Sequence, residues 1–199
     1  MHVELLFRLI GAKTLPIDHA HGLYGALKRL VPALEKIDGL GIHTFRGTPL
    51  PDGTLLVDPH RTKLRLRLNS EDIPTALGLA GSSLDILGSR FSLGVPEVHP
   101  LTSHKALWSR IVTLKFDTTE GDAARLQLAI HLEAAYPGAM WAIRRPRTIR
   151  IHGKQILGFE TLGEGFSPDE SLRLQEEGIG GRRKFGCGLF VGVGVRNRV

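Results

Sequence analysis

Residues 178–193, GIGGRRKFGCGLFVGV, place a short block of cations between glycines and end in an apolar run. Glycine tolerates positive φ and lets a ligand approach the backbone closely, and bare N–H groups beside cations suit a phosphate chain. The apolar run has the composition of a strand, which would anchor the segment on a sheet. We therefore expect either a phosphate-binding loop or a flexible surface turn, with the relevant residues being Gly180, Gly181, Arg182, Arg183, Lys184 and Phe185.

Two common nucleotide-binding fingerprints do not fit this segment. The P-loop signature requires Gly-Lys followed by Ser or Thr, and that combination is absent from the segment. The dinucleotide-binding fingerprint requires an acidic residue at a set distance after the glycines, and none follows there. The pattern therefore indicates phosphate contact of a different kind.

The composition favours a globular protein with a polyanionic partner. The chain has 199 residues, of which 42% are hydrophobic, with a formal net charge of +6 and a pI of about 9.8. This length allows one large domain or two small ones. The positive charge favours nucleic acid as the first choice of partner and an anionic membrane as the second.

The sequence also limits where the protein works. No apolar stretch is long enough to span a bilayer, and Glu4 and Arg8 interrupt the first one, so we expect neither a membrane span nor a signal peptide. The single cysteine, Cys187, excludes an internal disulfide and a cysteine-based metal site. These features suit a cytoplasmic protein.

The first half of the chain reads as alternating strands and helices. Asp18 is a predicted N-cap for a helix over residues 19–36, which Pro32 bends or shortens. A second predicted helix begins at Ser70. The predicted strands cover residues 3–10, 41–45, 54–57, 63–68 and 90–95, with residues 46–53 as a loop or hairpin tip. Apart from the short strand 54–57, this is the β-α-β-β-α-β order that is typical of the ferredoxin-like fold.

The strand over residues 63–68, KLRLRL, has a strict alternation of polar and apolar side chains. Successive side chains of a strand point to opposite faces of the sheet. We therefore expect the leucines to face inward and the cations to face outward, namely Lys63, Arg65 and Arg67.

The second half repeats a similar order of elements. Ser167 and Glu170, with Pro168 between them, form a predicted capping box at the start of a helix. The other predictions are a helix over 122–135 and strands over 107–116, 140–143, 148–152, 156–162 and 189–193. The sequence thus predicts an α+β protein of tandem ferredoxin-like (RRM-like) folds, with domains at 1–96 and 104–199 and a connector over 96–103.

Several motifs together resemble the CRISPR-associated repeat-processing endoribonucleases of the RAMP superfamily. They are PIDHAHGLYGAL, GIHTFRG and GEGFSPDESLRLQEEGIGGRRKFGCGLF, and the resemblance spans nearly the whole chain. It implies two ferredoxin-like folds, binding of a CRISPR repeat RNA hairpin, and one cut in the precursor RNA at the base of that hairpin. It also implies that the cut needs no metal or other cofactor and leaves a cyclic phosphate.

Metal-free RNA cleavage needs a base for the 2′-hydroxyl and an acid for the leaving oxygen, and histidine suits both roles. We predict His19, at a helix start that favours phosphate, as the base. His43 is predicted as the acid or orienting partner, although which histidine is base and which is acid stays open. His21 and Tyr24 share a helical stripe with Lys28 and form an alternative set.

The remaining histidines have no such neighbours in the sequence. We interpret as bystanders His60, His99, His104, His131 and His152. No pair of histidines has a metal-ligand spacing with carboxylates, so we predict no metal site.

A second basic cluster complements the glycine-rich segment. Arg144, Arg145, Arg147 and Arg150 lie on a predicted loop and strand edge, where they either bind RNA or form a solubilising surface turn. Phe185 beside Lys184 is a predicted base-stacking residue. Some relatives read the hairpin with a long arginine-rich helix, and this sequence lacks one, so the mode of hairpin recognition stays open.

The predicted function is a metal-independent endoribonuclease that cuts precursor CRISPR RNA and retains the product. Other subunits of a CRISPR effector complex are further predicted partners. The main alternative is a non-catalytic RAMP-type subunit that only binds RNA inside the complex. A weaker alternative is a general RNA-binding protein with a paired fold.

Overall fold

The computed structural model describes residues 1–58, 62–118 and 120–194 and divides the chain into two compact units between Pro100 and Leu101. His60, one of the histidines interpreted as bystanders, lies outside the described residues. We call the units the N-terminal unit and the C-terminal unit and describe each by itself.

The N-terminal unit is built on an antiparallel sheet, which has five strands within the described residues. Its strand order is β3 (Gly41–Ile42), β6 (Lys63–Asn69), β1 (His2–Gly11), β8 (Ser89–Pro100) and β7 (Ser83–Ile86). Without the edge strand β7, this is the order that the predicted β-α-β-β-α-β sequence gives in a ferredoxin-like fold. β7 was not predicted, and β8 continues through residues 96–100 of the predicted connector.

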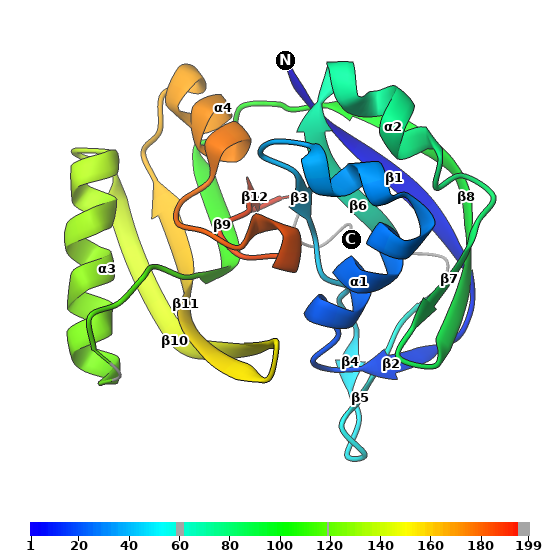
Figure 1. Cartoon of the computed structure of the whole chain (residues 1–199). Helices are drawn as coiled ribbons and strands as arrows, with labels where there is room; N and C mark the ends of the chain where they lie inside the picture. The colour runs from blue at the N-terminus through cyan, green and yellow to red at the C-terminus, as the bar shows by residue number, and fades with distance from the viewer. Residues whose placement is uncertain (59–61, 119, 195–199) are drawn as a thin grey trace. The chain divides into compact units, whose positions relative to one another are not determined.

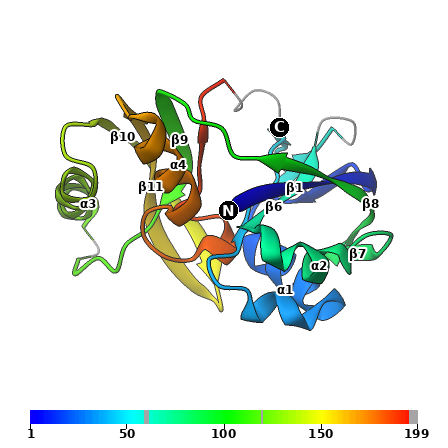
Figure 2. The ribbon, with the colours of Figure 1, turned by 90° about the horizontal axis from the view of Figure 1, so that it is seen from above.

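Helices cover one face of this sheet. Seen from above, α1 (Ala20–Leu30) and α2 (Ile73–Leu77) lie on the same side of β1, β6 and β8 (Figure 2). Alternate residues of β1 point toward them and are buried, and so are α1 residues at helical spacing. The resulting core includes Val3, Leu5, Phe7, Leu9, Leu23, Ala26 and Leu27.

Pro32 ends the first helix. The predicted helix over 19–36 is α1 followed by a 3₁₀ turn over Pro32–Lys36. A residue before proline is pushed out of the helical region, and Val31 accordingly has φ −133° and ψ 86°. The N-cap is His19 rather than the predicted Asp18. The second helix also differs, because Asn69 rather than Ser70 caps a 3₁₀ turn, Ser70–Asp72, ahead of α2.

A small second sheet combines a strand that follows β1 with a hairpin that lies between β3 and β6 in the sequence. It contains β2 (Thr14–Pro16), β5 (Thr54–Leu56) and β4 (Thr48–Pro49), and the β4–β5 hairpin projects from the unit (Figure 1). The predicted hairpin tip is confirmed, since the N–H of Leu50 donates to the carbonyl of Thr54 across it. The strands β2 and β4 were not predicted.

The C-terminal unit repeats the same topology. Its sheet order is β10 (Met140–Ile151), β11 (Lys154–Glu164), β9 (Ala106–Val112) and β12 (Phe190–Gly192). Two helices, α3 (Gly121–Ala135) and α4 (Pro168–Glu177), contribute to one hydrophobic cluster with the sheet. Its members include Leu107, Leu128, Phe159, Leu174 and Phe190.

The capping box at the start of α4 is confirmed. The hydroxyl of Ser167 accepts from the N–H of Glu170 at 3.3 Å, and the carboxylate of Glu170 accepts from the N–H of Ser167 at 2.9 Å. Pro168 occupies the first helical position, where a missing N–H costs no intrahelical bond.

The prediction that the arginine cluster lies on a loop was wrong. The arginine cluster was placed on a loop between two strands, yet β10 is one continuous strand with an irregular register between Ile143 and Pro146. β10 lies at the edge of the sheet, where proline does not remove a ladder hydrogen bond. The hairpin turn falls at His152 and Gly153, both with positive φ.

The glycine-rich segment is a packed loop. Gly188 donates its N–H to the carbonyl of Ile111 on β9 at 2.8 Å and accepts from the N–H of Ile179 at 3.2 Å. Gly181 donates to the carbonyl of Thr113 at 3.3 Å. A 3₁₀ turn, Arg183–Phe185, follows. These bonds tie the loop to the sheet, so it is not a loose surface turn.

Among the described residues, no helix combines the length and the apolar character that a membrane span requires.

Gly188→Ala should destabilise the protein, whereas Gly181→Ala should not. Gly188 has φ +67°, and an added Cβ would lie 2.2 Å from the carbonyl oxygen of Ile179. The expected loss is about 1–3 kcal/mol of unfolding free energy. Nothing lies within 4 Å of a Cβ at Gly181, so that control should stay within about 0.5 kcal/mol of the wild type. Urea denaturation measures both, and equal stabilities would contradict the packed loop.

Candidate active site

A buried carboxylate lies on the sheet face of the N-terminal unit that the helices do not cover. Glu4 on β1 is directly opposite Arg67 on β6, and opposite residues share a face of the sheet. Arg67 donates from Nη2 to Oε1 of Glu4 at 2.5 Å and from Nε to the same oxygen at 3.2 Å. Nε of Arg65 lies 3.4 Å from the other carboxylate oxygen. One acid thus pairs with two cations.

The prediction that Arg65 and Arg67 face outward was half wrong. They do lie on the opposite face from the leucines of β6, but Arg67 is only 1% exposed and Arg65 is also buried. Charges are buried only when they are paired, and Glu4 supplies the pairing. Burial lowers the pKa of the Arg65 guanidinium, with Glu4 acting against that shift and Arg67 adding to it.

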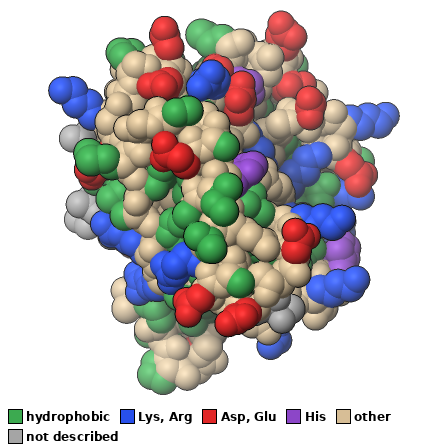
Figure 3. Space-filling view, turned by 90° about the vertical axis from the view of Figure 1, so that its left-hand side faces the viewer, with side chains coloured by type: hydrophobic (Ala, Val, Ile, Leu, Met, Phe, Trp, Pro, Cys, Tyr) green, Lys and Arg blue, Asp and Glu red, His purple; other side chains and the backbone are tan. Residues whose placement is uncertain are grey.

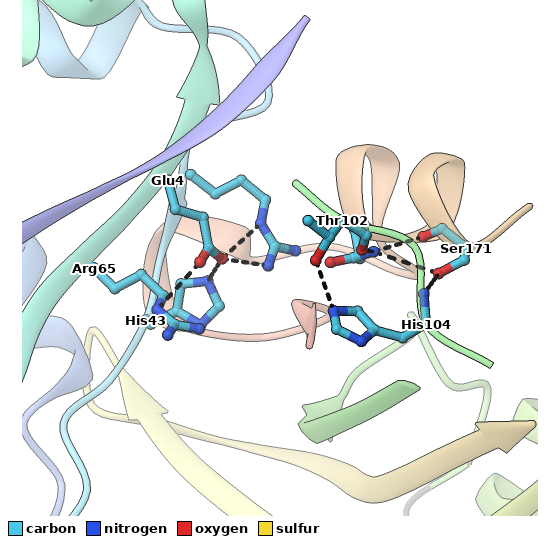
Figure 4. Close-up of polar contacts among 8 residues, drawn as sticks. Glu4, His43, Arg65, Thr102, His104 and Ser171 are labelled. Carbon is cyan, nitrogen blue, oxygen red and sulfur yellow. Dashed lines mark hydrogen bonds and ion pairs between the residues drawn. The ribbon is translucent and has the colours of Figure 1, made fainter. Parts of the chain in front are cut away.

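His43 lies beside this carboxylate (Figure 4). Its N–H donates to the carbonyl of Arg65 at 3.0 Å, which continues the β3–β6 pairing by one residue. Its Nε2 is 3.6 Å from Oε1 of Glu4, and its side chain is 16% exposed. The imidazole therefore faces an acid across an ion-pair distance that is too long for a hydrogen bond, and Nε2 itself is buried. The side chain as a whole is still partly accessible, which suits a group that exchanges protons.

His19, the predicted base, is only 1% exposed. Its Nδ1 hydrogen-bonds to the carbonyl oxygens of Pro16 and Ile17 at 2.9 and 3.1 Å, and its Nε2 accepts from the N–H of Phe45 at 3.0 Å. The ring also stacks on the ring of Phe45, with centroids 5.6 Å apart. In this arrangement both ring nitrogens are bonded to the main chain, which does not favour a role in proton transfer to a substrate.

The alternative set of His21, Tyr24 and Lys28 lies on α1. Tyr24 packs partly buried against the core of the N-terminal unit, and His21 is half-buried. Lys28 instead donates to Glu35 at 2.6 Å, and this hydrogen bond raises the pKa of the lysine. The structure therefore gives the cation of this stripe a carboxylate partner within the same unit.

His99 was interpreted as a bystander, but it lies on β8 directly opposite Glu4. It contacts Oε2 of Glu97 at 3.2 Å, and Glu97 also accepts from Lys63 at 2.9 Å. Sequence reasoning missed Glu4 and His99 as neighbours because the predicted strand stopped at residue 95. Had the alternation been extended to Pro100, the pairing register with β1 would have suggested this proximity.

Within the part of the chain that the structure describes, no group of three or more His, Cys, Asp or Glu side chains is arranged to hold a metal ion.

In the C-terminal unit, a buried acid holds two of the predicted arginines. Glu160 on β11 is buried, accepts from Nε1 of Trp108 at 2.9 Å and from Nε of Arg145 at 2.8 Å, and lies 3.5 Å from Nη2 of Arg147. Burial raises the pKa of Glu160, but the bonds from Arg145 and Trp108 outweigh it and leave the pKa below its ordinary value. The Arg145 side chain is nevertheless 69% exposed, and Arg144 and Arg150 are exposed too.

The face that carries α3 is different in character. There, acidic and basic side chains are mixed around hydrophobic ones (Figure 3). Two of the exposed hydrophobic residues of α3 are Leu126 and Ile130. A mixed surface of this kind does not concentrate positive charge, whereas the exposed arginines of β10 do.

Two cations of the glycine-rich loop form hydrogen bonds that stabilise the loop. Arg183 donates from Nη1 to the carbonyl of Glu177, and Arg182 donates from Nη1 to the hydroxyl of Thr113 at 3.4 Å. Phe185, the predicted stacking residue, packs half-buried against a small cluster that contains Ile111 and Cys187. Burial raises the pKa of the Cys187 thiol to about 11. Gly180 and Gly181 are exposed, and Lys184 is half-buried.

His104 fastens the beginning of the C-terminal unit to α4 (Figure 4). Its N–H donates to the hydroxyl of Ser171 at 2.8 Å, and its Nε2 lies 3.1 Å from the hydroxyl of Thr102. Gln175 donates to the carbonyl of Thr102 at 2.8 Å. The ring also covers Gly192, where an added Cβ would lie 2.5 Å away. These contacts support a structural role for His104.

Comparison with known proteins identifies the family of the chain. The family model described as Cas6 Crispr matches residues 3–194. The chain belongs to the Cas6 family. It is 40% identical over 198 residues to the CRISPR-associated endonuclease Cas6 of Myxococcus xanthus (strain DK1622), a match that covers 99% of this chain and 84% of that protein. As a member of this family, the chain is a CRISPR-associated endonuclease, as the resemblance of its motifs implied.

Solved structures agree on the fold. A CRISPR-associated protein Cas6 superposes with a TM-score of 0.66 at 16% identity and covers 97% of this chain and 99% of its own. A RAMP protein that binds different RNA substrates gives a TM-score of 0.66 at 16% identity and covers 96% and 98%. The predicted tandem ferredoxin-like fold of Cas6 and RAMP proteins is thereby confirmed.

Removing the charge of Glu4 should cost this Cas6 family member more stability than removing that of Arg67. Glu4→Gln leaves two buried guanidinium groups uncompensated, and the expected loss is about 3–5 kcal/mol of unfolding free energy. Arg67→Met should cost less, because Glu4 keeps Arg65 as a partner. The control is Glu97→Gln, an exposed carboxylate paired with Lys63, which should lose far less, because exposed ion pairs contribute little to stability.

Denaturant unfolding of the three variants tests this order. A Glu4→Gln protein as stable as Glu97→Gln would show that the buried pair contributes little.

Proposed function

We propose that this Cas6 protein is a metal-independent endoribonuclease that binds a CRISPR repeat hairpin and cuts precursor CRISPR RNA at its base. The observation that carries the proposal is the partly exposed imidazole of His43, which lies 3.6 Å from a buried Glu4 that is itself paired with two arginines. The likeness to a protein named CRISPR-associated endonuclease supports the nuclease class.

The proposed reaction uses the RNA's own 2′-hydroxyl as the nucleophile. The 2′-oxygen forms a bond to the adjacent phosphorus as its proton passes to a base, and the bond from phosphorus to the 5′-oxygen breaks as that oxygen receives a proton. The products are a 2′,3′-cyclic phosphate and a 5′-hydroxyl. Positioned side chains that move these protons typically accelerate such a step by about 10²–10⁴-fold.

His43 is the group that we assign to this proton exchange. A carboxylate beside an imidazole holds the ring in one orientation and stabilises its protonated form, as in hydrolytic triads. Oε1 of Glu4 lies 3.6 Å from Nε2 of His43, which is longer than a hydrogen bond, and we propose that this contact tightens when RNA binds. The first choice from the sequence, His19, is not assigned to proton exchange, because its ring is buried and bonded to the main chain.

RNA binding is assigned to the exposed arginines of β10 and to the glycine-rich loop. Arg145 and Arg147 contact the buried Glu160, so their guanidinium groups are ordered before a phosphate arrives. Arg144, Arg150 and Lys184 add positive charge, and the exposed Gly181, with nothing within 4 Å of a Cβ there, leaves room for a backbone approach. Gly180 packs against the carbonyl of Thr113 and holds the loop in place for that approach. We further propose that the protein keeps its product and joins other subunits of a CRISPR effector complex.

A labelled CRISPR repeat RNA incubated with the protein in EDTA tests the catalytic part. We expect one discrete cut, a cyclic phosphate on the upstream product by mass, and a single-turnover rate at least about 100-fold lower in His43→Ala with unchanged RNA affinity. The control is His152→Ala, which removes an exposed histidine from the β10–β11 turn.

Three results would contradict this assignment. Cleavage that requires an added metal would remove the metal-independent mechanism. Full activity of His43→Ala, with loss in His21→Ala or Tyr24→Phe, would move the site to α1. Tight binding without any cut would instead support a non-catalytic RNA-binding subunit.

Arg145→Gln and Arg150→Gln should each weaken RNA binding and reduce its salt dependence. Each lost phosphate contact lowers the slope of log affinity against log salt by about 0.7–0.9. The control is Arg90→Gln on β8, because the Arg90 side chain is 82% exposed and pairs with an acid, Asp85, as Arg145 does with Glu160. Filter binding between about 50 and 200 mM salt measures the slope, and equal slopes for all three variants would argue against RNA contact at β10.

A further inference from the structure

His19 joins three segments of the N-terminal unit that are separate in the sequence. Its ring reaches the carbonyls of Pro16 and Ile17 at the end of β2. Its own carbonyl accepts from the N–H of Leu23 at 2.7 Å, which is the first hydrogen bond of α1. On its far side, the ring accepts from the N–H of Phe45, which follows β3. One buried side chain thus fixes the relative positions of these segments.

The hydrogen bonds of the ring define its protonation state. A carbonyl oxygen only accepts and a backbone N–H only donates, so Nδ1 carries the proton and Nε2 carries the lone pair. Only the neutral Nδ1–H tautomer satisfies both sides. A protonated ring would direct a second N–H at the N–H of Phe45 and break that contact.

His19 hydrogen-bonds to the segment 43–45, which includes His43. At one end, the N–H of His43 is bonded to Arg65 on β6 at 3.0 Å. At the other end, the N–H of Phe45 is bonded to Nε2 of His19 at 3.0 Å. The Phe45 ring is buried between the rings of His19 and Phe91, with centroids at 5.6 and 6.0 Å. Both ends of the tripeptide 43–45 are therefore fixed.

We propose that His19 is a positioning residue, which acts through Phe45 to place the imidazole of His43 against Glu4. This inference rests on the proposed function, in which His43 exchanges protons with the RNA. It gives the buried histidine a role in the reaction without contact to substrate. It also explains the residue type, because a neutral imidazole is a rigid plate with a donor at one edge and an acceptor at the other.

Two carboxamide substitutions test separately the hydrogen bonds at Nδ1 and at Nε2 of the ring. In His19→Asn, the short amide can still donate to the carbonyls of Pro16 and Ile17 but cannot reach Phe45. In His19→Gln, the longer side chain can bring its oxygen to the N–H of Phe45 and loses the other donor. Both variants remove the imidazole and leave a polar side chain of similar character in the same buried place.

The test is single-turnover cleavage of a repeat RNA by both variants, with RNA affinity and melting temperature measured in parallel. We expect a rate about 10–30-fold lower for His19→Asn and within about 3-fold of the wild type for His19→Gln, a difference of the size that a small displacement of a catalytic group produces. RNA affinity should change by less than about 2-fold. The shape of the pH–rate profile should be the same in both, because the titrating group is unchanged.

Other outcomes overturn the inference. Equal large losses in both variants, with one limb of the pH–rate profile removed, would mean that His19 exchanges the proton itself. Equal rates in both would mean that the contact with Phe45 does not matter for His43.

A second variant covers the case in which His19→Asn fails to fold. Replacing Phe45 by its α-hydroxy acid deletes the N–H and leaves every side chain in place. We expect the same 10–30-fold loss of rate, and a rate equal to that of the wild type would overturn the inference.

His43→Ala in the same assay keeps the two proposals apart. If His43→Ala cuts normally, the assignment of His43 fails and the positioning role fails with it. If His43→Ala is inactive while His19→Asn cuts at the wild-type rate, only the positioning role fails.

Discussion

The buried charge of Glu4 constrains the face of the N-terminal sheet that the helices do not cover. A carboxylate cannot remain ionised away from water without countercharges, and here Arg67 and Arg65 on the neighbouring strand supply them. The register of β1 and β6 puts Glu4 directly opposite Arg67, so a one-residue slip would separate them. The same carboxylate faces His43, and the ion cluster therefore links the pairing of the sheet to the placement of the imidazole.

Two histidines of the N-terminal unit, His19 and His43, have different environments and suit different tasks. His19 is buried, stacked on Phe45 and bonded to backbone groups at both ring nitrogens, which suits a fixed neutral ring. His43 is partly exposed beside a carboxylate, which suits a ring that changes its protonation. The short segment 43–45 connects them, so packing at one affects geometry at the other.

Local signals in the sequence were sufficient for the fold and for the main helices and strands, although not for the short strands β2, β4 and β7. The capping box at Ser167, the alternation in β6 and the helix-ending effect of Pro32 depend on neighbouring residues, and each is visible without tertiary contacts. The Cas6 family was reached in a different way, through its motifs rather than through periodicity.

The features that the sequence did not predict for Arg67, His19 and Pro146 depend on residues that are distant in the sequence. Alternation placed Arg67 on the correct face but could not show its burial, because Glu4 lies 63 residues away in the sequence. A histidine at a helix start looks exposed, and only the contact with Phe45, 26 residues later, reveals that His19 is buried. Pro146 indicated a loop, but an edge strand accommodates it.

The assignment of a positioning role to His19 and of proton exchange to His43 is tested most directly by NMR of the imidazole nitrogens. The measurement is a long-range ¹H–¹⁵N correlation spectrum of ¹⁵N-histidine protein, without and with a repeat RNA that carries a 2′-deoxy nucleotide at the cut and so cannot react. The account predicts that His19 has the Nδ1–H tautomer in both spectra and that the RNA shifts the signals of His43. An RNA-induced change at His19 with none at His43 would contradict it.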